Sequence, residues 1–277
     1  MKTVQIVRYG EINIKGKNRD VFEKQLAANI KTCLKYNDIP YERVERKRNR
    51  IFVHTDANVS PLRTVFGISS FSRAIVFEYD KEELKKQIRK LIEGIKFNSF
   101  RVSVQRLDKS FPFTSMELER EMGAYVVEIC KKKVSLKEFD LNIQIEFALG
   151  EVYLFTERVK CFDGLPPGTE GNVCMELHDE KSTLTALLMM KRGCKCFFTG
   201  KQPTNANLLE KYLHRKVFIE SEDLKTVMKN KGCLAHIVPD TFPDIQKYED
   251  ERVLRPLVAL TKEQIQSTLN MFEEAAA

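Results

Sequence analysis

The sequence lacks the features of several large classes of protein. No run approaches the ~20 apolar residues that a membrane-spanning helix needs, and the N-terminus has no apolar signal region. The seven cysteines form no CxxC pair, and an odd number in a chain of 277 residues does not indicate a disulfide framework. We therefore expect a cytoplasmic protein without a membrane role, whose cysteines are buried or spare thiols.

Sequence motifs of common catalytic and metal sites are also missing. The chain has no Gly-x-Ser-x-Gly elbow, no HExxH and no Walker loop, and its four histidines show no ligand spacing. His178, Asp179 and Glu180 are consecutive in a loop, and such residues seldom converge on one site. The sequence thus predicts no catalytic residue, no metal ligand and no cofactor.

What the chain does contain is ordinary globular composition with an uneven charge. Hydrophobic residues make up 43% and charged residues 31%, in a length sufficient for two or three domains. Residues 1–58 hold 13 Lys and Arg against 7 Asp and Glu; residues 59–160 hold 18 against 15; residues 161–277 hold 15 against 17. The basic front of the chain favours binding of a polyanion.

Hydrophobic periodicity predicts an α/β protein whose front half is α+β. Strands are expected at 4–7, 41–46, 50–55, 75–79, 100–106, 140–147 and 151–156, and helices at 18–36, 81–95 and 114–133. Residues 162–171 hold three glycines and two prolines, which is typical of a linker. Beyond it, strands at 173–177, 194–199, 216–220 and 233–238 alternate with helices at 182–192, 206–213 and 223–230. This alternation predicts a parallel sheet, followed by a last helix at 261–273 and a frayed Ala275–Ala277.

The turn between the expected strand at 173–177 and the helix at 182–192 has no glycine. A strand–turn–helix unit of an α/β domain commonly holds a nucleotide phosphate, for which glycines let backbone N–H groups close on the anion. Here the turn carries the carboxylates Asp179 and Glu180, which would repel a phosphate. The sequence therefore predicts the architecture of a nucleotide enzyme without its phosphate loop.

Two basic loops are the candidate binding segments. The first contains Arg8, Lys15, Lys17 and Arg19 with two glycines, and it is either a solvated loop or a contact to a phosphate backbone. A basic turn adds Arg46 and Arg48. The second loop, which precedes a helix, holds Arg106, Lys109 and Phe111; the phenylalanine would stack on a base or join the core.

These blocks together resemble the ThiI family, the tRNA 4-thiouridine synthetases. The resemblance rests on Arg8–Ile12 with Lys15–Arg19, on Phe66–Ser72, and on Asp108–Pro112 with Thr114 and Glu117. Further matches are Gly164–Pro166 in the linker and Leu188–Gly193 and Val253–Leu257 beyond it. The resemblance covers nearly the whole chain.

The resemblance implies a ferredoxin-like N-terminal domain (1–58), a THUMP domain (59–160), a linker (161–172) and a shortened Rossmann-like PP-loop domain (173–277). In that family the first two domains bind tRNA, and the PP-loop domain adenylates a uridine with ATP. The PP-loop signature Ser-Gly-Gly-x-Asp-Ser falls on a degenerate loop in which only the last serine survives: Leu177, His178, Asp179, Glu180, Lys181 and Ser182.

We therefore expect a tRNA-binding protein without catalysis that acts in or beside tRNA thiolation. The expected contacts to tRNA are Arg8, Lys15, Lys17, Arg19, Arg46, Arg48, Arg106, Lys109 and Phe111. Its partner besides tRNA would be a second copy or a separate catalytic subunit. Two alternatives stay open: an active tRNA sulfurtransferase in which Lys181 or Ser182 meets phosphate and Cys233 carries sulfur, and a protein-interaction scaffold.

Overall fold

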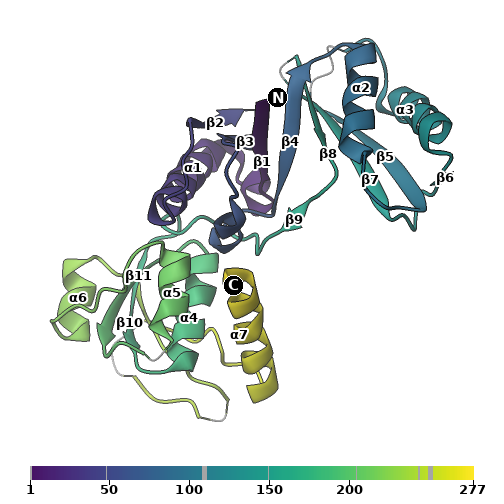
Figure 1. Cartoon of the computed structure of the whole chain (residues 1–277). Coiled ribbons are helices and arrows are strands. Elements are labelled where there is room, and N and C mark those ends of the chain that lie inside the picture. The colour runs from purple at the N-terminus through teal and green to yellow at the C-terminus, as the bar shows by residue number, and fades with distance from the viewer. Residues whose placement is uncertain are drawn as a thin grey trace. The chain divides into compact units, whose positions relative to one another are not determined.

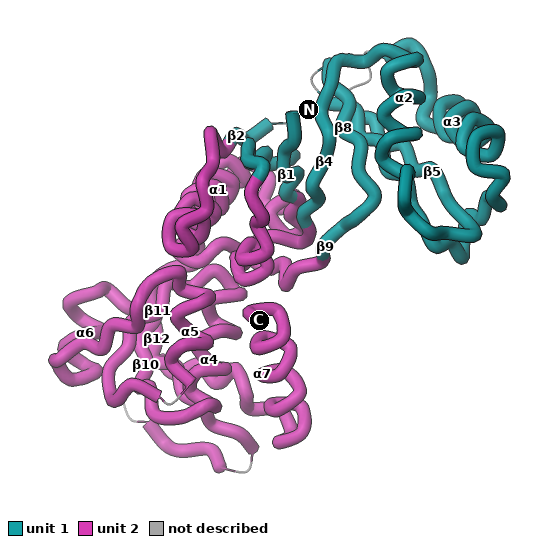
Figure 2. Tube along the Cα trace, in the orientation of Figure 1, with its two compact units in different colours: residues 1–7, 45–56, 71–159 teal, residues 8–44, 57–70, 160–277 magenta. Residues whose placement is uncertain are grey.

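A computed structural model describes residues 2–47, 49–107, 111–148, 150–203, 205–242, 244–248 and 252–277. The chain forms two compact units, each assembled from separate segments (Figure 2). The first unit comprises residues 1–7, 45–56 and 71–159, and the second comprises residues 8–44, 57–70 and 160–277. No helix in the described parts of the chain is long and apolar enough to cross a membrane.

The first unit is built on a mixed sheet with the strand order β2-β3-β1-β4-β8-β7-β5-β6, and β9 pairs with β4. The strands are β1 (Lys2–Arg8), β2 (Arg43–Lys47), β3 (Arg50–His54), β4 (Ser70–Glu78), β5 (Ser99–Arg106), β6 (Lys133–Val134), β7 (Leu141–Ala148), β8 (Glu151–Phe155) and β9 (Val159–Lys160). β5 runs parallel to β7 and to β6, whereas β8 is antiparallel to both β4 and β7.

Helices α2 (Lys81–Ile92) and α3 (Ser115–Cys130) lie beside β5 and β7 (Figure 1). Their apolar side chains join the core of this unit. Over residues 99–104 of β5, half-buried and buried residues alternate, as expected for a strand with one face in the core. Leu84 and Ile88 of α2 and Leu118 and Met122 of α3 share one apolar cluster with that face. A capping box begins α3: Glu117 N donates to the Thr114 hydroxyl at 3.2 Å, and Thr114 N donates to Glu117 Oε2 at 2.7 Å.

The second unit contains a parallel sheet in the order β11-β10-β12-β13, which confirms the parallel sheet expected there. Its elements are α1 (Arg19–Tyr36), the 3-10 turns Glu11–Ile14, Gly16–Asn18 and Ser60–Thr64, β10 (Asn172–Leu177), α4 (Glu180–Lys191), β11 (Lys195–Gly200), α5 (Ala206–Leu213), α6 (Leu224–Asn230), β12 (Ala235–Ile237), β13 (Val253–Leu254) and α7 (Lys262–Ala276). Figure 1 shows α6 on one side of this sheet and α4 and α5 on the other.

Two local predictions in this unit are wrong. Residues 216–220 form no strand, and only an isolated bridge joins Ile219 to Phe198 of β11. The reason is that the Glu210 carboxylate accepts from Lys216 Nζ at 2.8 Å and from Val217 N at 3.1 Å, which ties the start of this segment to α5. The last helix was predicted to end at residue 273, but α7 continues to Ala276, whose carbonyl accepts from Lys211 Nζ at 2.7 Å.

His214 is a buried polar residue that follows α5. It is 6% exposed, its φ is 52°, and neither ring nitrogen has a hydrogen-bond partner among the described residues. Burial lowers the pKa of His214 to about 4, so the folded protein holds a neutral imidazole at neutral pH.

This histidine makes stability depend on pH. An unfolded histidine has a pKa of about 6.5, so between about pH 6.5 and about pH 4 the unfolded state binds a proton that the folded state does not. The free energy of unfolding should therefore fall with decreasing pH in this window, by up to about 1.4 kcal/mol per pH unit from this group. Urea unfolding at about pH 7 and about pH 5 measures the slope. The variant His214→Asn, in which asparagine tolerates the positive φ, should flatten the dependence of the free energy of unfolding on pH. The control His178→Asn, at an exposed position, should leave the slope unchanged. Equal slopes in wild type and both variants would contradict the assignment of this pH dependence to His214.

Candidate nucleic-acid interface

The first basic loop of the second unit has one freely exposed cation and two paired ones. Lys17 lies on the surface. Lys15 Nζ is 2.6 Å from Glu170 Oε1 and 4.5 Å from the Phe22 ring centroid. Arg19 Nε is 2.6 Å from Glu23 Oε1. Both paired side chains are still about a quarter exposed, at 28% for Lys15 and 26% for Arg19, so each keeps donor capacity toward solvent.

Arg8 differs from the other cations of this loop. It is the last residue of β1 and is 5% exposed, and its carbonyl accepts from Ser69 N at 2.8 Å. At this depth the Arg8 guanidinium is almost closed to solvent. The surface available to an extended polyanion at this loop is therefore that of Lys15, Lys17 and Arg19.

A buried tyrosine orients Arg19. Tyr9 donates its phenol O–H to Glu23 Oε1 at 2.6 Å and accepts from Arg19 Nη2 at 3.0 Å, and it is 3% exposed. Burial, reinforced by the hydrogen bond to Glu23, raises the pKa of Tyr9 above its ordinary value, so the phenol stays protonated. This network holds the guanidinium at the start of α1.

The linker after β9 holds the same loop in place. Gly10 N donates to Asp163 Oδ1 at 3.1 Å, and Arg192 Nη1 lies 3.4 Å from Glu11 Oε2. A Cβ on residue 10 would collide with the Asp163 carboxylate, so glycine is needed there for the approach of the linker. Sequence reasoning missed Asp163 and Glu170 because both lie more than 150 positions from their partners, at separations of 153 and 155 residues.

The second predicted site lies in the first unit, and its aromatic residues are packed together. Phe111 meets Phe147 edge-on at a centroid distance of 4.7 Å, and Phe113 lies 5.2 Å from the same ring. Arg106 Nη2 donates to Phe111 O at 3.0 Å, and its guanidinium lies 5.8 Å from the Phe113 ring centroid. Phe111 and Phe113 are half-buried and pack against the apolar core of this unit, which favours the core alternative for Phe111. Arg46 is half-buried on β2, while Arg48 and Lys109 lie outside the described residues.

The glycine-free turn after β10 closes on itself. Asp179 is the N-cap of α4, and its carboxylate accepts from Ser182 N at 2.8 Å. In return Ser182 Oγ accepts from His178 N and Asp179 N, both at 3.0 Å. The helix therefore begins at Glu180, two residues before the predicted start. The backbone N–H groups of His178, Asp179 and Ser182, which a phosphate loop would offer to an anion, are bonded here to the chain's own oxygens.

The cysteines are free thiols, four of them buried. Cys233, the residue considered as a sulfur carrier, is half-buried, and burial raises the pKa of its thiol. A raised pKa lowers the fraction of the nucleophilic thiolate at neutral pH. Within the described parts of the chain, no group of three or more His, Cys, Asp or Glu side chains is placed to hold a metal ion.

Comparison with known proteins matches two family models to the front of the chain. The family model of the ThiI ferredoxin-like domain matches residues 4–72, and that of the THUMP domain matches residues 78–157. A probable tRNA sulfurtransferase of Caldanaerobacter subterraneus is 32% identical over 260 residues, covering 90% of this chain and 65% of that protein. Another from Thermococcus kodakarensis is 35% identical over 204 residues, covering 70% of this chain and 54% of that protein. The chain thus spans roughly half to two thirds of the length of these curated relatives.

Solved structures agree over the full length. The crystal structure of PH1313 from Pyrococcus horikoshii Ot3 superposes with a TM-score of 0.87 at 33% identity, covering 99% of this chain and 100% of that one. A 4-thiouridine synthetase, solved as an RNA complex with bound ATP, has the same fold, with a TM-score of 0.80 at 23% identity. The fold and its basic loop define an α/β protein with ferredoxin-like and THUMP domains ahead of a Rossmann-like domain. The chain belongs to the ThiI family.

Proposed function

We propose that this protein binds tRNA without catalysing its modification, and that it acts in or beside tRNA thiolation. One observation carries the proposal: the family's ferredoxin-like and THUMP domains are kept, while the turn after β10 is closed by Asp179 and Ser182. The curated relatives named as tRNA sulfurtransferases supply the substrate class. A separate subunit would provide the catalytic step, and a second copy of the chain is the other partner proposed.

The proposed contacts are electrostatic. Phosphate contacts position a protein on double-stranded RNA, whose A-form shape is recognised mainly through the backbone. Lys17 is the exposed cation of the first loop, and Lys15 and Arg19 flank it with partly exposed charges. Arg46, Arg48, Arg106 and Lys109 are proposed as further contacts, with Arg8 and Phe111 supporting their loops.

The salt dependence of tRNA affinity tests this proposal. Bulk tRNA would be titrated at two salt concentrations with wild type, Lys17→Glu and the double variant Lys15→Glu/Lys17→Glu. Affinity should fall with salt, and each lost phosphate contact should reduce the slope of log affinity against log salt by about 1. The double variant Lys225→Glu/Lys262→Glu carries the same charge change on exposed positions of α6 and α7 and should behave like wild type.

Two results would decide against the proposal. Absent or salt-insensitive tRNA binding would contradict tRNA binding through this loop. Micromolar ATP binding by the same preparation would favour the alternative of an active sulfurtransferase, in which Lys181 or Ser182 meets phosphate. Ser182 is fully buried and its hydroxyl donates to Asp179 O at 2.7 Å, so ATP would have to displace an existing hydrogen-bond network.

A further inference from the structure

The second unit contains a cavity that lies away from the glycine-free turn after β10. A cavity of about 660 Å³ is bounded by α1, the linker, β11 and the segment that follows α5. β11 runs parallel to β10, with Lys195 opposite Asn172 at one end and Gly200 opposite Leu177 at the other. Lys195 and Phe197, which line the cavity, therefore lie toward the amino end of β11, whereas the Asp179 turn follows the carboxyl end of β10.

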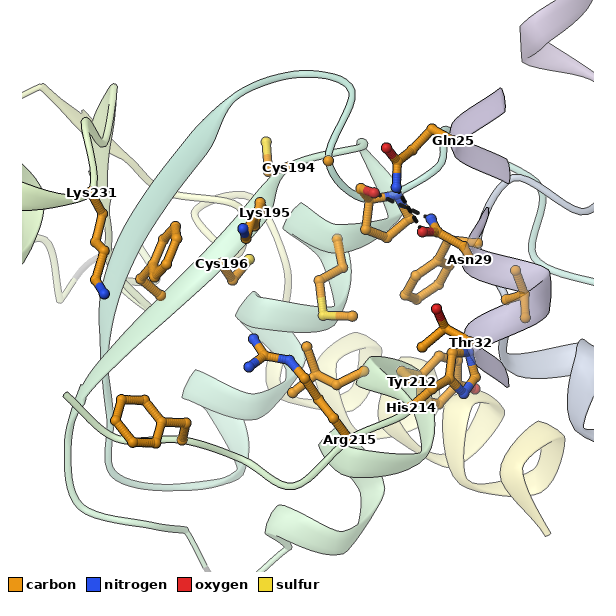
Figure 3. Close-up of a pocket in the computed structure, with 18 of the residues that line it drawn as sticks. Gln25, Asn29, Thr32, Cys194, Lys195, Cys196, Tyr212, His214, Arg215 and Lys231 are labelled. Atoms are coloured by element: carbon orange, nitrogen blue, oxygen red, sulfur yellow. Dashed lines mark hydrogen bonds between the residues drawn. The ribbon is translucent and has the colours of Figure 1, made fainter. Parts of the chain in front are cut away.

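The cavity has a cationic side. The lining contains three cations, Lys195, Arg215 and Lys231, and one carboxylate, Glu220. The charged side chains of the lining therefore carry a net charge of +2. Lys231 Nζ is 3.1 Å from Glu220 Oε1, but Lys195 and Arg215 are exposed and form no ion pair within the described residues. Figure 3 shows Lys195 and Lys231 on the side of the cavity away from α1, with Arg215 below Lys195. An anion is the ligand that these groups favour.

An aromatic platform adjoins the cations. The Phe197 ring has Lys195 Nζ at 5.3 Å and Lys231 Nζ at 5.5 Å from its centroid. Phe218, 61% exposed, contributes a second ring to the lining. Base rings stack on such side chains, while neighbouring cations take the phosphate. The pairing of ring and cation distinguishes this cavity from a site for a simple inorganic anion.

The α1 side offers hydrogen-bonding groups. Gln25 Nε2 donates to Asn29 Oδ1 at 2.8 Å, and Asn29 Nδ2 donates to Pro167 O at 3.2 Å (Figure 3). These bonds fix both amides and leave the Gln25 side-chain oxygen as an acceptor. The wall also contains His214, whose buried neutral ring has a donor and an acceptor without partners in the described structure. A buried polar group without a partner indicates a missing ligand atom or water.

We propose that this cavity binds a single nucleotide, with its phosphate at Lys195 and Arg215 and its base between the phenylalanines and the α1 amides. The nucleotide is either a free mononucleotide or an unstacked residue of an RNA strand, since both present the same phosphate and base. The proposal goes beyond tRNA binding through the first loop and does not depend on it. The loop around Arg215 is held by the buried Glu210, through Lys216 and Val217, so the site is preformed.

Calorimetric titration of the full chain with UMP, AMP, uridine and a short single-stranded RNA tests this inference. If the natural ligand is a free mononucleotide, UMP or AMP should bind saturably and uridine, which lacks the phosphate, should not. If the natural ligand is a residue of an RNA strand, only the RNA should bind. In either case Arg215→Glu and Lys195→Glu should weaken binding at least about tenfold, because each places a carboxylate at the phosphate position. Lys262→Glu on the exposed start of α7 is the matched charge reversal and should bind like wild type.

The variants separate this site from the first basic loop. RNA binding that is lost in Lys17→Glu but kept in Arg215→Glu and Lys195→Glu would overturn the cavity proposal while supporting tRNA binding by the loop. Failure of every probe to saturate would also overturn it, and so would an equal loss in Lys262→Glu. Thermal melting of each variant identifies any loss that is caused by unfolding.

Discussion

Replacing Phe66 with alanine is expected to lower the free energy of unfolding by about 3–5 kcal/mol. Phe66 is 1% exposed and stacks on Tyr212 at a centroid distance of 5.1 Å. Phe272 meets it edge-on at 6.0 Å, and Phe162 lies at 6.2 Å. The alanine would leave a cavity among three rings that cannot collapse without moving α5 and α7, so both the transfer energy and the packing energy are lost.

Urea unfolding followed by far-UV circular dichroism measures this effect, since the chain contains no tryptophan to report on its core. Phe218→Ala serves as the control because Phe218 is 61% exposed, and we expect little change from it. A Phe66→Ala loss below about 1 kcal/mol would show that the ring cluster is not packed as described. A large loss would establish that residues 57–70 stabilise the C-terminal half of the chain.

Replacing Glu146 with alanine is expected to cost a similar amount, about 3–5 kcal/mol, in the first unit. Glu146 is 3% exposed on β7, and its carboxylate lies 3.3 Å from Arg50 Nε and 3.7 Å from Arg158 Nη2. The Arg50 side chain is itself only 10% exposed. Removing the carboxylate would leave a guanidinium desolvated without its counter-charge, which costs more than the ion pair contributes to stability.

A double replacement distinguishes this penalty from simple loss of packing. Arg50→Met/Glu146→Leu removes both charges and should restore most of the lost stability, because neither member is then left buried alone. Glu121→Ala breaks the exposed pair with Lys81 at 2.9 Å and should change stability little. Chemical denaturation gives the free energy of unfolding of all three variants. If the double variant is as unstable as Glu146→Ala, the loss is not caused by an unpaired buried charge.

Most of the secondary structure was predictable because its causes are local. The helix at 206–213 was predicted to the residue, and capping boxes at Thr114 and Thr261 mark two helix starts. A capping box joins residues three positions apart, so the sequence displays both partners. The prediction of a strand at 216–220 was wrong because the buried Glu210 carboxylate on α5 accepts from the backbone of this segment. The periodicity of the segment gives no indication of this hydrogen bond.

The candidate site was predictable only in part. The basic loop, the glycine-free turn and the parallel sheet were all predicted from residues close together in the sequence. The depth of Arg8, the packing of Phe111 and the pairing of Lys15 with Glu170 do not, since each depends on residues distant in sequence. No sequence motif indicated the cavity near His214, because its lining combines residues of α1, the linker and four further segments that are distant in sequence.

The sequence by itself determined the class of fold, the basic character of the first 160 residues and the loss of the glycine-rich loop. These properties depend on composition, on periodicity and on side chains within one turn of each other. Only the tertiary structure decided which cations are exposed, how Asp163 and Glu170 support the loop, and where the cavity of the second unit lies. The physical reason is that burial and ion pairing are set by packing between segments, and the partners here are separated by up to 155 residues of chain.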